Sequence, residues 1–208
     1  MLSNRIAQLA PPPRPVPLPV VCSTMLGLTG SIGAAFLVMG LVFVWVPIGD
    51  APFWVFPLVV LFPLLGAVLF GLATVQGLRR VTLLRYGEVA TARTISRRGT
   101  NTYVNDEPVM EYTYEFQGLD GQVYSGSARA LGRAEIGDED EEPVLYLASN
   151  PGLSTLVDAL PLRCTLDVDE AGQWISYESV WSVLWYALAW AGIVAHVIYG
   201  LSRVLGVL

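Results

Sequence analysis

Three stretches of the chain contain no charged residue and are long enough to cross a bilayer. They are residues 20–46, 53–78 and 180–201, the last within a C-terminal segment of residues 177–208. A helix rises about 1.5 Å per residue, so about 20 apolar residues cross a hydrocarbon core of about 30 Å. The pattern predicts three transmembrane helices. The first two form a hairpin, and the third follows after a long polar interval.

Small residues and prolines interrupt the first two apolar stretches. Gly27, Ser31 and Ala35 recur at four-residue intervals, as do Gly30 and Ala34. Small residues at that spacing allow another helix to approach closely. The second stretch contains Pro57 and Pro63, which predict a kinked helix because proline removes a backbone hydrogen bond.

The pattern changes to a period of two in the middle of the chain. Residues 109–117 alternate, with Tyr112, Tyr114 and Phe116 on one side. Alternation of this kind predicts a strand with one face in a core and the other in water. A glycine-rich turn at residues 118–121 leads into residues 122–130, and the two segments predict a β-hairpin.

Further strands are expected on both sides of this hairpin. Residues 88–97 precede it, joined through RGTNTYVNDEP, and residues 143–148 follow it and end at a predicted Asn150-Pro151-Gly152 turn. Residues 164–168 and 173–177 predict another hairpin. The fold class expected is therefore membrane α plus soluble all-β. Residues 79–176 form its small antiparallel sheet or barrel.

Residues 1–19 form a proline-rich N-terminal tail that includes PPPRPVPLP. Dense proline favours the polyproline II conformation and excludes a helix. We interpret the segment as a stiff leader before the first helix. The alternative is a ligand for a proline-binding module.

Arginine positions predict the orientation of the helices. Arg5 and Arg14 precede the first span, whereas Arg79, Arg80 and Arg85 follow the second. The turn between the spans has no Arg or Lys. The positive-inside rule places both outer ends of the hairpin in the cytoplasm. The chain is thus expected to be a multi-pass protein of the cell (inner) membrane with a cytoplasmic central domain. The three arginines after the second span are candidate contacts for anionic lipid headgroups.

Composition narrows the expected partners. The chain is 53% hydrophobic and 14% charged, with a net charge of −6, against about 25% charged residues in ordinary globular domains. An acidic balance does not indicate nucleic-acid binding. We expect membrane lipid as a partner, together with either a homo-oligomer or a larger membrane complex, and no cofactor.

His196 is the one histidine of the chain and lies inside the third apolar stretch. An ionisable residue within a membrane is a candidate functional site. One interpretation is a proton relay or a metal ligand. The other is a hydrogen-bonded residue at a helix contact, because a metal site needs several ligands.

Two groups of carboxylates are candidate interaction surfaces. The first is the unbroken acidic run of Asp138, Glu139, Asp140, Glu141 and Glu142. It is either a solvated loop or a docking site for a basic partner. The second is the pair Glu111 and Glu115, which share a strand face. They form either an exposed face or an acid/base pair.

The central stretch contains a series of short motifs: Gly87 to Ala92, the Tyr112/Tyr114/Phe116 strand with Asp120-Gly121, Gly137, Val144 to Leu147, and Asn150 to Ser154. In these residues it resembles a bacterial membrane-protein family known as domain of unknown function number thirty-five ninety-two. The resemblance implies a small β-domain flanked by transmembrane helices, and it implies no activity. We therefore expect no enzyme but a membrane protein that presents a β-domain for protein interaction or self-assembly. The alternatives are an accessory subunit of a transport or envelope-maintenance complex and, less favoured, a membrane-bound enzyme.

Overall fold

The computed structural model describes residues 6–44, 55–104, 106–131, 141–160, 166–177 and 180–204. The chain divides into two compact units. The β unit comprises Met1–Val20 and Arg79–Tyr177, and the helical unit comprises Val21–Leu78 and Glu178–Leu208.

Three long helices correspond to the three apolar stretches. They are α2 (Leu18–Val44), α3 (Val55–Tyr86) and α4 (Trp181–Val204). Each is long and apolar enough to cross a membrane. Two helices precede the sheet and one follows it, which confirms the predicted order. The second helix is longer than predicted, because α3 continues through its arginines to Tyr86.

Glycines bring α2 and α3 together within the helical unit. A Cβ atom added to Gly33 would lie 2.6 Å from the Phe70 backbone nitrogen and 2.9 Å from the Gly66 carbonyl oxygen. Ala34 is buried in the same contact, so of the two predicted sets of small residues the one with Gly30 and Ala34 faces the neighbouring helix.

The other predicted set does not line this contact. Ala35 is exposed, and Gly27 lies at a break in α2, with φ 46° and ψ −161°. The backbone departs from helical geometry at this glycine, whereas α3 continues through Pro63. Glycine tolerates a positive φ because it has no Cβ.

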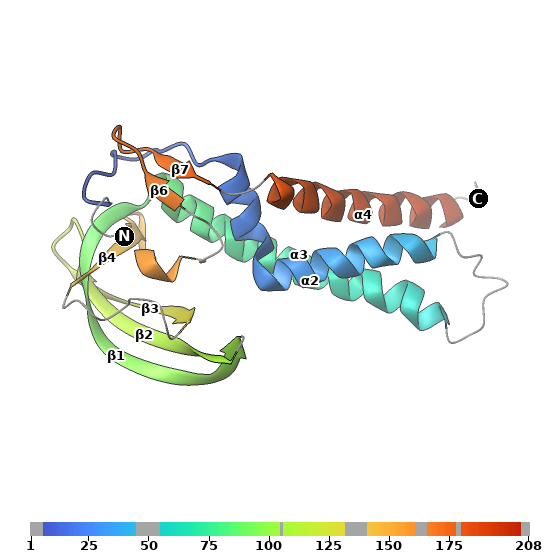
Figure 1. The fold of residues 1–208 in the computed structure, drawn as a ribbon, viewed down its shortest axis with the longest axis horizontal. Helices are drawn as coiled ribbons and strands as arrows, with labels where there is room; N and C mark the ends of the chain where they lie inside the picture. The colour runs from blue at the N-terminus through green and yellow to red at the C-terminus, as the bar shows by residue number, and fades with distance from the viewer. Residues whose placement is uncertain are drawn as a thin grey trace. The chain divides into compact units, whose positions relative to one another are not determined.

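The β unit is built on a five-stranded sheet with the order β3-β2-β1-β4-β5. Its strands are β1 (Glu88–Val104), β2 (Glu107–Gln117), β3 (Val123–Leu131), β4 (Glu142–Leu147) and β5 (Asn150–Leu156). All four pairings are antiparallel. The predicted antiparallel sheet is thus confirmed (Figure 1). The predicted second hairpin is also present, as β6 (Leu166–Val168) and β7 (Trp174–Ser176).

The sheet curls until its two edge strands, β3 and β5, meet. A Cβ atom on Gly126 of β3 would lie 2.6 Å from the Tyr114 hydroxyl oxygen and 2.7 Å from Oγ of Ser154 on β5. Only glycine fits at this position, and its missing side chain allows the sheet to close almost completely.

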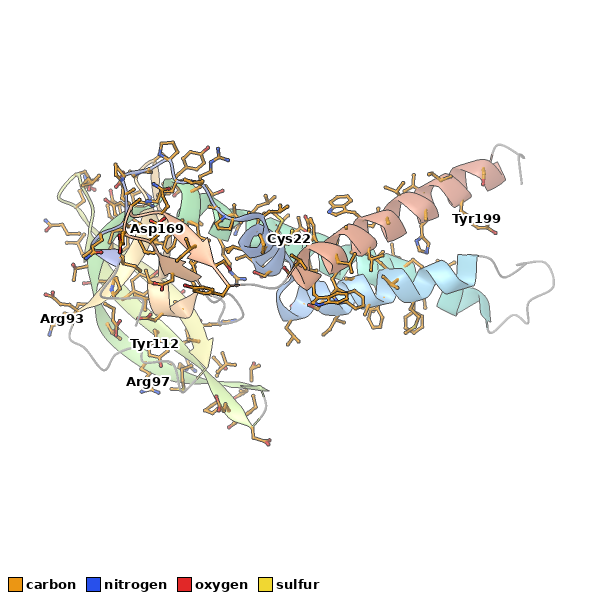
Figure 2. The ribbon with its side chains drawn as sticks, turned by 45° about the horizontal axis from the view of Figure 1, so that its top comes forward. Cys22, Arg93, Arg97, Tyr112, Asp169 and Tyr199 are labelled. Atoms are coloured by element: carbon orange, nitrogen blue, oxygen red, sulfur yellow. The ribbon has the colours of Figure 1, made fainter. Side chains whose placement is uncertain are left out.

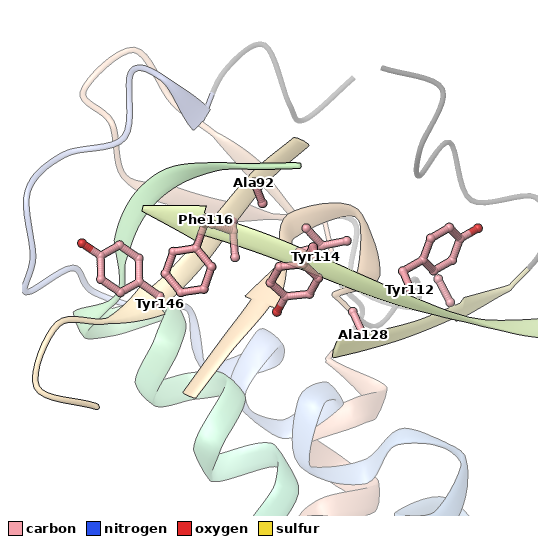
Figure 3. Close-up of a cluster of buried hydrophobic side chains, with 9 residues drawn as sticks. Ala92, Tyr112, Tyr114, Phe116, Ala128 and Tyr146 are labelled. Carbon is pink, nitrogen blue, oxygen red and sulfur yellow. The ribbon is translucent and has the colours of Figure 1, made fainter. Parts of the chain in front are cut away.

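The inner face of the curled sheet holds the main core of the β unit (Figure 3). Tyr112, Tyr114 and Phe116 are almost fully buried, which confirms the face that the alternation predicted. The ring of Phe116 lies 5.0 Å from that of Tyr146 on β4. The buried members of the core are Ala92, Tyr112, Tyr114, Phe116, Ala128, Ala130, Val144, Tyr146 and Leu156.

The proline-rich segment belongs to the β unit, where it contacts the end of α3. Arg14 is buried, and its guanidinium donates to the carbonyls of Ala10 and Gly87, the latter at 2.8 Å. Its backbone N–H donates to the Arg85 carbonyl at 2.8 Å. Burial lowers the pKa of Arg14, while Glu88 opposes this shift. The segment therefore donates hydrogen bonds to backbone carbonyls at the end of α3, where a helix provides no partner of its own.

A second core covers the outer face of β4. Leu145 packs there with Leu84 of α3 and with Trp174 of β7. The Trp174 indole N–H donates to the Leu84 carbonyl at 2.8 Å. The last turn of α3 is thus held to the sheet by apolar packing and by hydrogen bonds.

Two predicted connections are strands instead. Most of RGTNTYVNDEP belongs to β1 and β2, which join through a tight turn where Asp106 has φ 65°. The predicted Asn150-Pro151-Gly152 turn is the start of β5. Threonine, tyrosine and valine favour strands, and proline is tolerated on an edge strand such as β5 because it has no N–H to leave unpaired.

Candidate interaction surface

The outer face of β1, β2 and β3 carries opposite charges in cross-strand register. Arg98 lies opposite Glu111, and Glu111 lies opposite Arg129. Arg93 lies opposite Glu115. Directly opposed residues of antiparallel strands share a face, so these side chains belong to one surface.

Glu111 forms an ion pair on this surface. Arg129 donates to its Oε1 atom through Nη2 at 3.0 Å and through Nε at 3.1 Å. The Arg129 side chain is 69% exposed and that of Glu111 34%. Exposed pairs of this kind contribute at most about 1 kcal/mol to stability. The predicted acidic face of Glu111 and Glu115 is therefore a mixed-charge face.

The arginines of this face were missed by the sequence reasoning, although strand register could have found them. Once β1 is paired with β2, Arg93 and Arg98 fall opposite the two glutamates. Among the residues described, no ion pair or hydrogen bond engages either guanidinium. Figure 2 shows Arg93 extending from β1. Arg97 lies on the other face, with its guanidinium 5.5 Å from the centre of the Tyr112 ring.

The acidic run is only partly described. Glu141 is exposed, whereas Glu142 is 3% exposed and pairs with Ala92 at the start of β4. Because Ala92 belongs to the inner core, Glu142 cannot serve as part of an exposed surface. Asp138, Glu139 and Asp140 lie outside the described residues.

Hydroxyl groups line the inside of the sheet. The Tyr114 hydroxyl lies 3.1 Å from Oγ of Ser154, and the Tyr146 hydroxyl accepts the Leu119 backbone N–H at 2.9 Å. Burial raises the pKa of Tyr114, and the contact with Ser154 opposes that shift. The Tyr112 hydroxyl is buried with no hydrogen-bond partner among the described residues. Tyr112 and Tyr114 were predicted to share the core face of their strand, and their burial agrees with that role.

His196 lies at a contact of all three helices of the helical unit. Its Nδ1 atom is 2.6 Å from the Gly192 carbonyl oxygen. A carbonyl only accepts, so Nδ1 is the donor in this contact. Nε2 is buried with no partner among the described residues, and a Cβ atom on Gly40 would lie 2.9 Å from it and 2.6 Å from Cγ of Pro63. This geometry favours the helix-packing interpretation, with Gly40 making room for the imidazole.

The membrane-proximal arginines lie on the last turns of α3. Arg79 and Arg85 are exposed, whereas Arg80 is half-buried. The Arg85 guanidinium lies 5.3 Å from the centre of the Tyr86 ring. Cations at the C-terminal end of a helix interact favourably with its dipole. These side chains surround the end of the apolar part of α3.

Within the described residues, no group of three His, Cys, Asp or Glu side chains is arranged to hold a metal ion. No family model, curated protein or solved structure matches the chain. The resemblance to domain of unknown function number thirty-five ninety-two therefore stays a prediction.

Proposed function

We propose that this chain is an integral membrane protein that presents a small cytoplasmic β-domain to a protein partner or to copies of itself. The observation that carries the proposal is the division of the chain into two units, one of which is a sheet with its own core. A separately packed sheet with an exposed charged face is suited to binding. The three long apolar helices are suited to anchoring it.

Thiol labelling tests the proposed orientation. Cys164 is first replaced by alanine, and Thr102→Cys then places a reporter on an exposed position of β1, while the natural Cys22 is buried. We expect an impermeant maleimide to label this reporter only after permeabilisation. A matched reporter, Gly49→Cys, lies in the turn predicted outside and should react in intact cells. The reverse result would place the β unit outside.

Crosslinking in native membranes tests the binding function. We expect specific adducts to the β unit, formed through reporters such as Thr102→Cys and absent when the reporter is moved into α3. Recovery of only the monomer and lipid with several crosslinkers would contradict the proposal.

The second candidate function is an accessory subunit of a transport or envelope-maintenance complex. It is favoured by the apolar side chains that α4 leaves exposed, among them Leu184, Leu188 and Val194. Lipid or other membrane helices would cover them. Purification in mild detergent separates the candidates, because a homo-oligomer supports self-assembly and co-migration with a larger complex supports the accessory role.

A membrane-bound enzyme is the least favoured candidate. It would use His196 or the face with Glu111 and Glu115, and the latter face already holds an ion pair with Arg129. Retention of a deletion-complementing phenotype by His196→Ala would remove the histidine as a catalytic candidate.

A further inference from the structure

Strand β1 pairs with β4 along its first part and with β2 along the rest, and the two pairings overlap only at Ala92. β4 pairs with it from Glu88, opposite Tyr146, to Ala92, opposite Glu142. β2 pairs with it from Ala92 to Val104 on the other side. Among the residues described, no other strand pairs with β1 beyond Ala92. Residues 93–104 therefore form an edge, which we call the β1 edge (Figure 1).

The β1 edge is also exposed to solvent. From Arg93 to Tyr103 the side chains are exposed, apart from half-buried Thr94 and Thr100. Ile95 is 55% and Tyr103 67% exposed. An edge strand presents alternate N–H and C=O groups that can pair with another chain. Proteins usually shorten, bend or cover such an edge. This one is long, but its pairing with β2 is irregular between Thr94 and Ser96 and between Gly99 and Tyr103.

The charge of the β1 edge differs from that of the whole chain. Three arginines fall within residues 93–98, and residues 93–104 contain no Asp or Glu, in a chain of net charge −6. Arg93 and Arg98 lie on the outer face without a partner among the described residues. Arg97 lies on the inner face, beside Tyr112. Basic side chains thus lie on both faces of the edge.

We propose that the β1 edge binds an extended acidic segment of a partner protein as an added strand. Backbone hydrogen bonds along residues 93–104 supply affinity, and the arginines select for carboxylates through charge-assisted hydrogen bonds. A second copy of the same edge is a poor occupant, because it would bring together two basic segments that contain no Asp or Glu. This inference rests on the proposed function and names its surface and its class of partner.

A synthetic peptide provides the probe. It has about ten residues, the length of a long strand, and alternates glutamate with valine. The protein is the full chain in detergent micelles, and binding is measured by fluorescence anisotropy of the labelled peptide. We expect the Glu–Val peptide to bind, more weakly at high salt. A Lys–Val peptide should not bind, and a Glu–Val peptide with alternate backbone nitrogens methylated should lose most of its affinity.

Charge reversal on the protein locates the site. Arg93→Glu combined with Arg98→Glu should weaken binding of the Glu–Val peptide by roughly tenfold or more, because like charges then oppose each other. Arg129→Glu is the matched control, since Arg129 lies on the same face but on β3. It should change the affinity by less than about twofold. Arg97 is left unchanged in the double variant because its guanidinium contacts the Tyr112 ring. Thermal unfolding checks that the double variant is folded.

Several outcomes would overturn the inference. The first is unchanged binding of the Glu–Val peptide by the folded double variant. The second is an equal loss of affinity in Arg129→Glu, which would indicate general charge attraction. The third is full binding of the methylated peptide by the natural protein. Self-association that is abolished by the double variant would instead identify a second copy as the occupant. If native crosslinking recovers the same partner with the double variant, the β1 edge is not its site and the proposed function stands. If crosslinking with the natural sequence recovers no partner, the proposed function fails whatever the peptide does.

Discussion

The two parts of β1 show how one strand can serve both a core and a surface. Residues 88–92 pair with β4, and they place Ala90 and Ala92 against the aromatic core. Residues 93–104 pair only with β2 and carry exposed threonine, arginine and tyrosine side chains. Small inward residues allow the sheet to curl around its tyrosines. Beyond Ala92, where β1 no longer pairs with β4, most of its side chains are exposed and core packing does not constrain them.

The difference predicts where substitutions destabilise the fold. In the first part, side chains fill a closed interior, so their removal leaves a cavity. In the second part, side chains meet solvent, so their removal should affect binding more than stability. The following variants test this contrast, from the largest expected effect to the smallest.

Tyr146→Ala should give the largest loss of stability. Tyr146 is 1% exposed, lies opposite Glu88 and packs on Phe116. Truncating a buried aromatic ring costs about 3 to 5 kcal/mol, measured as the free energy of unfolding of the full chain in micelles. Tyr146→Phe removes only the acceptor of the Leu119 N–H and should cost about 1 kcal/mol. Equal effects of the two variants would contradict a closed core.

Glu111→Gln should have a smaller effect. It weakens the ion pair with Arg129 on the outer face, and exposed pairs contribute at most about 1 kcal/mol. Glu115→Gln is the control, because no ion pair of Glu115 is found among the described residues. A double-mutant cycle with Arg129→Gln measures the coupling. A coupling well above 1 kcal/mol would mean that the outer face is more deeply buried than described.

Arg98→Gln in the second part of β1 should leave stability nearly unchanged. The side chain is exposed and has no partner among the described residues, so we expect a change within about 0.5 kcal/mol. Thermal unfolding measures it. A large destabilisation would show that the β1 edge is covered within the chain.

The smallest effect should be a pH dependence at the turn between β2 and β3. The pKa of Asp120 lies below its ordinary value of 3.8 because the Tyr124 hydroxyl donates to its carboxylate and the Gln122 N–H donates a second bond. A lowered folded pKa stabilises the fold above about pH 4, and this stabilisation is lost as the pH falls through the folded value. Natural protein and Asp120→Ala should therefore differ in melting temperature near pH 6, and the difference should shrink as the pH falls below 3.8. A difference that is independent of pH would contradict the assignment.

Local pattern was sufficient to predict the elements whose signal is periodic. The three apolar stretches became helices, and the alternation of Tyr112, Tyr114 and Phe116 became the inner face of β2. Both signals depend on residue spacing alone. The polar segment RGTNTYVNDEP was misread as a loop, because its strand pairing depends on β2 rather than on its own periodicity.

Features that depend on tertiary contacts could not be read from local pattern. Closure of the sheet depends on Gly126 meeting Ser154, which are distant in the chain. Arg14 appeared to belong to a tail because its acceptor, the Gly87 carbonyl, lies far along the sequence. The charged surface was half predicted: the glutamates of β2 were identified, whereas the arginines opposite them required the strand register.

Residue-resolved amide hydrogen exchange of the full chain in micelles tests most directly whether β1 is open on one side beyond Ala92. The account predicts slow exchange at the paired amides of residues 88–92. Beyond Ala92, the amides bonded to β2 should exchange slowly and those that face away from it should exchange fast. Regular alternation should be broken where the pairing shifts, between Thr94 and Ser96 and between Gly99 and Tyr103. Addition of the Glu–Val peptide should slow the fast set. Uniformly slow exchange through Tyr103 without the peptide would contradict an open β1 edge.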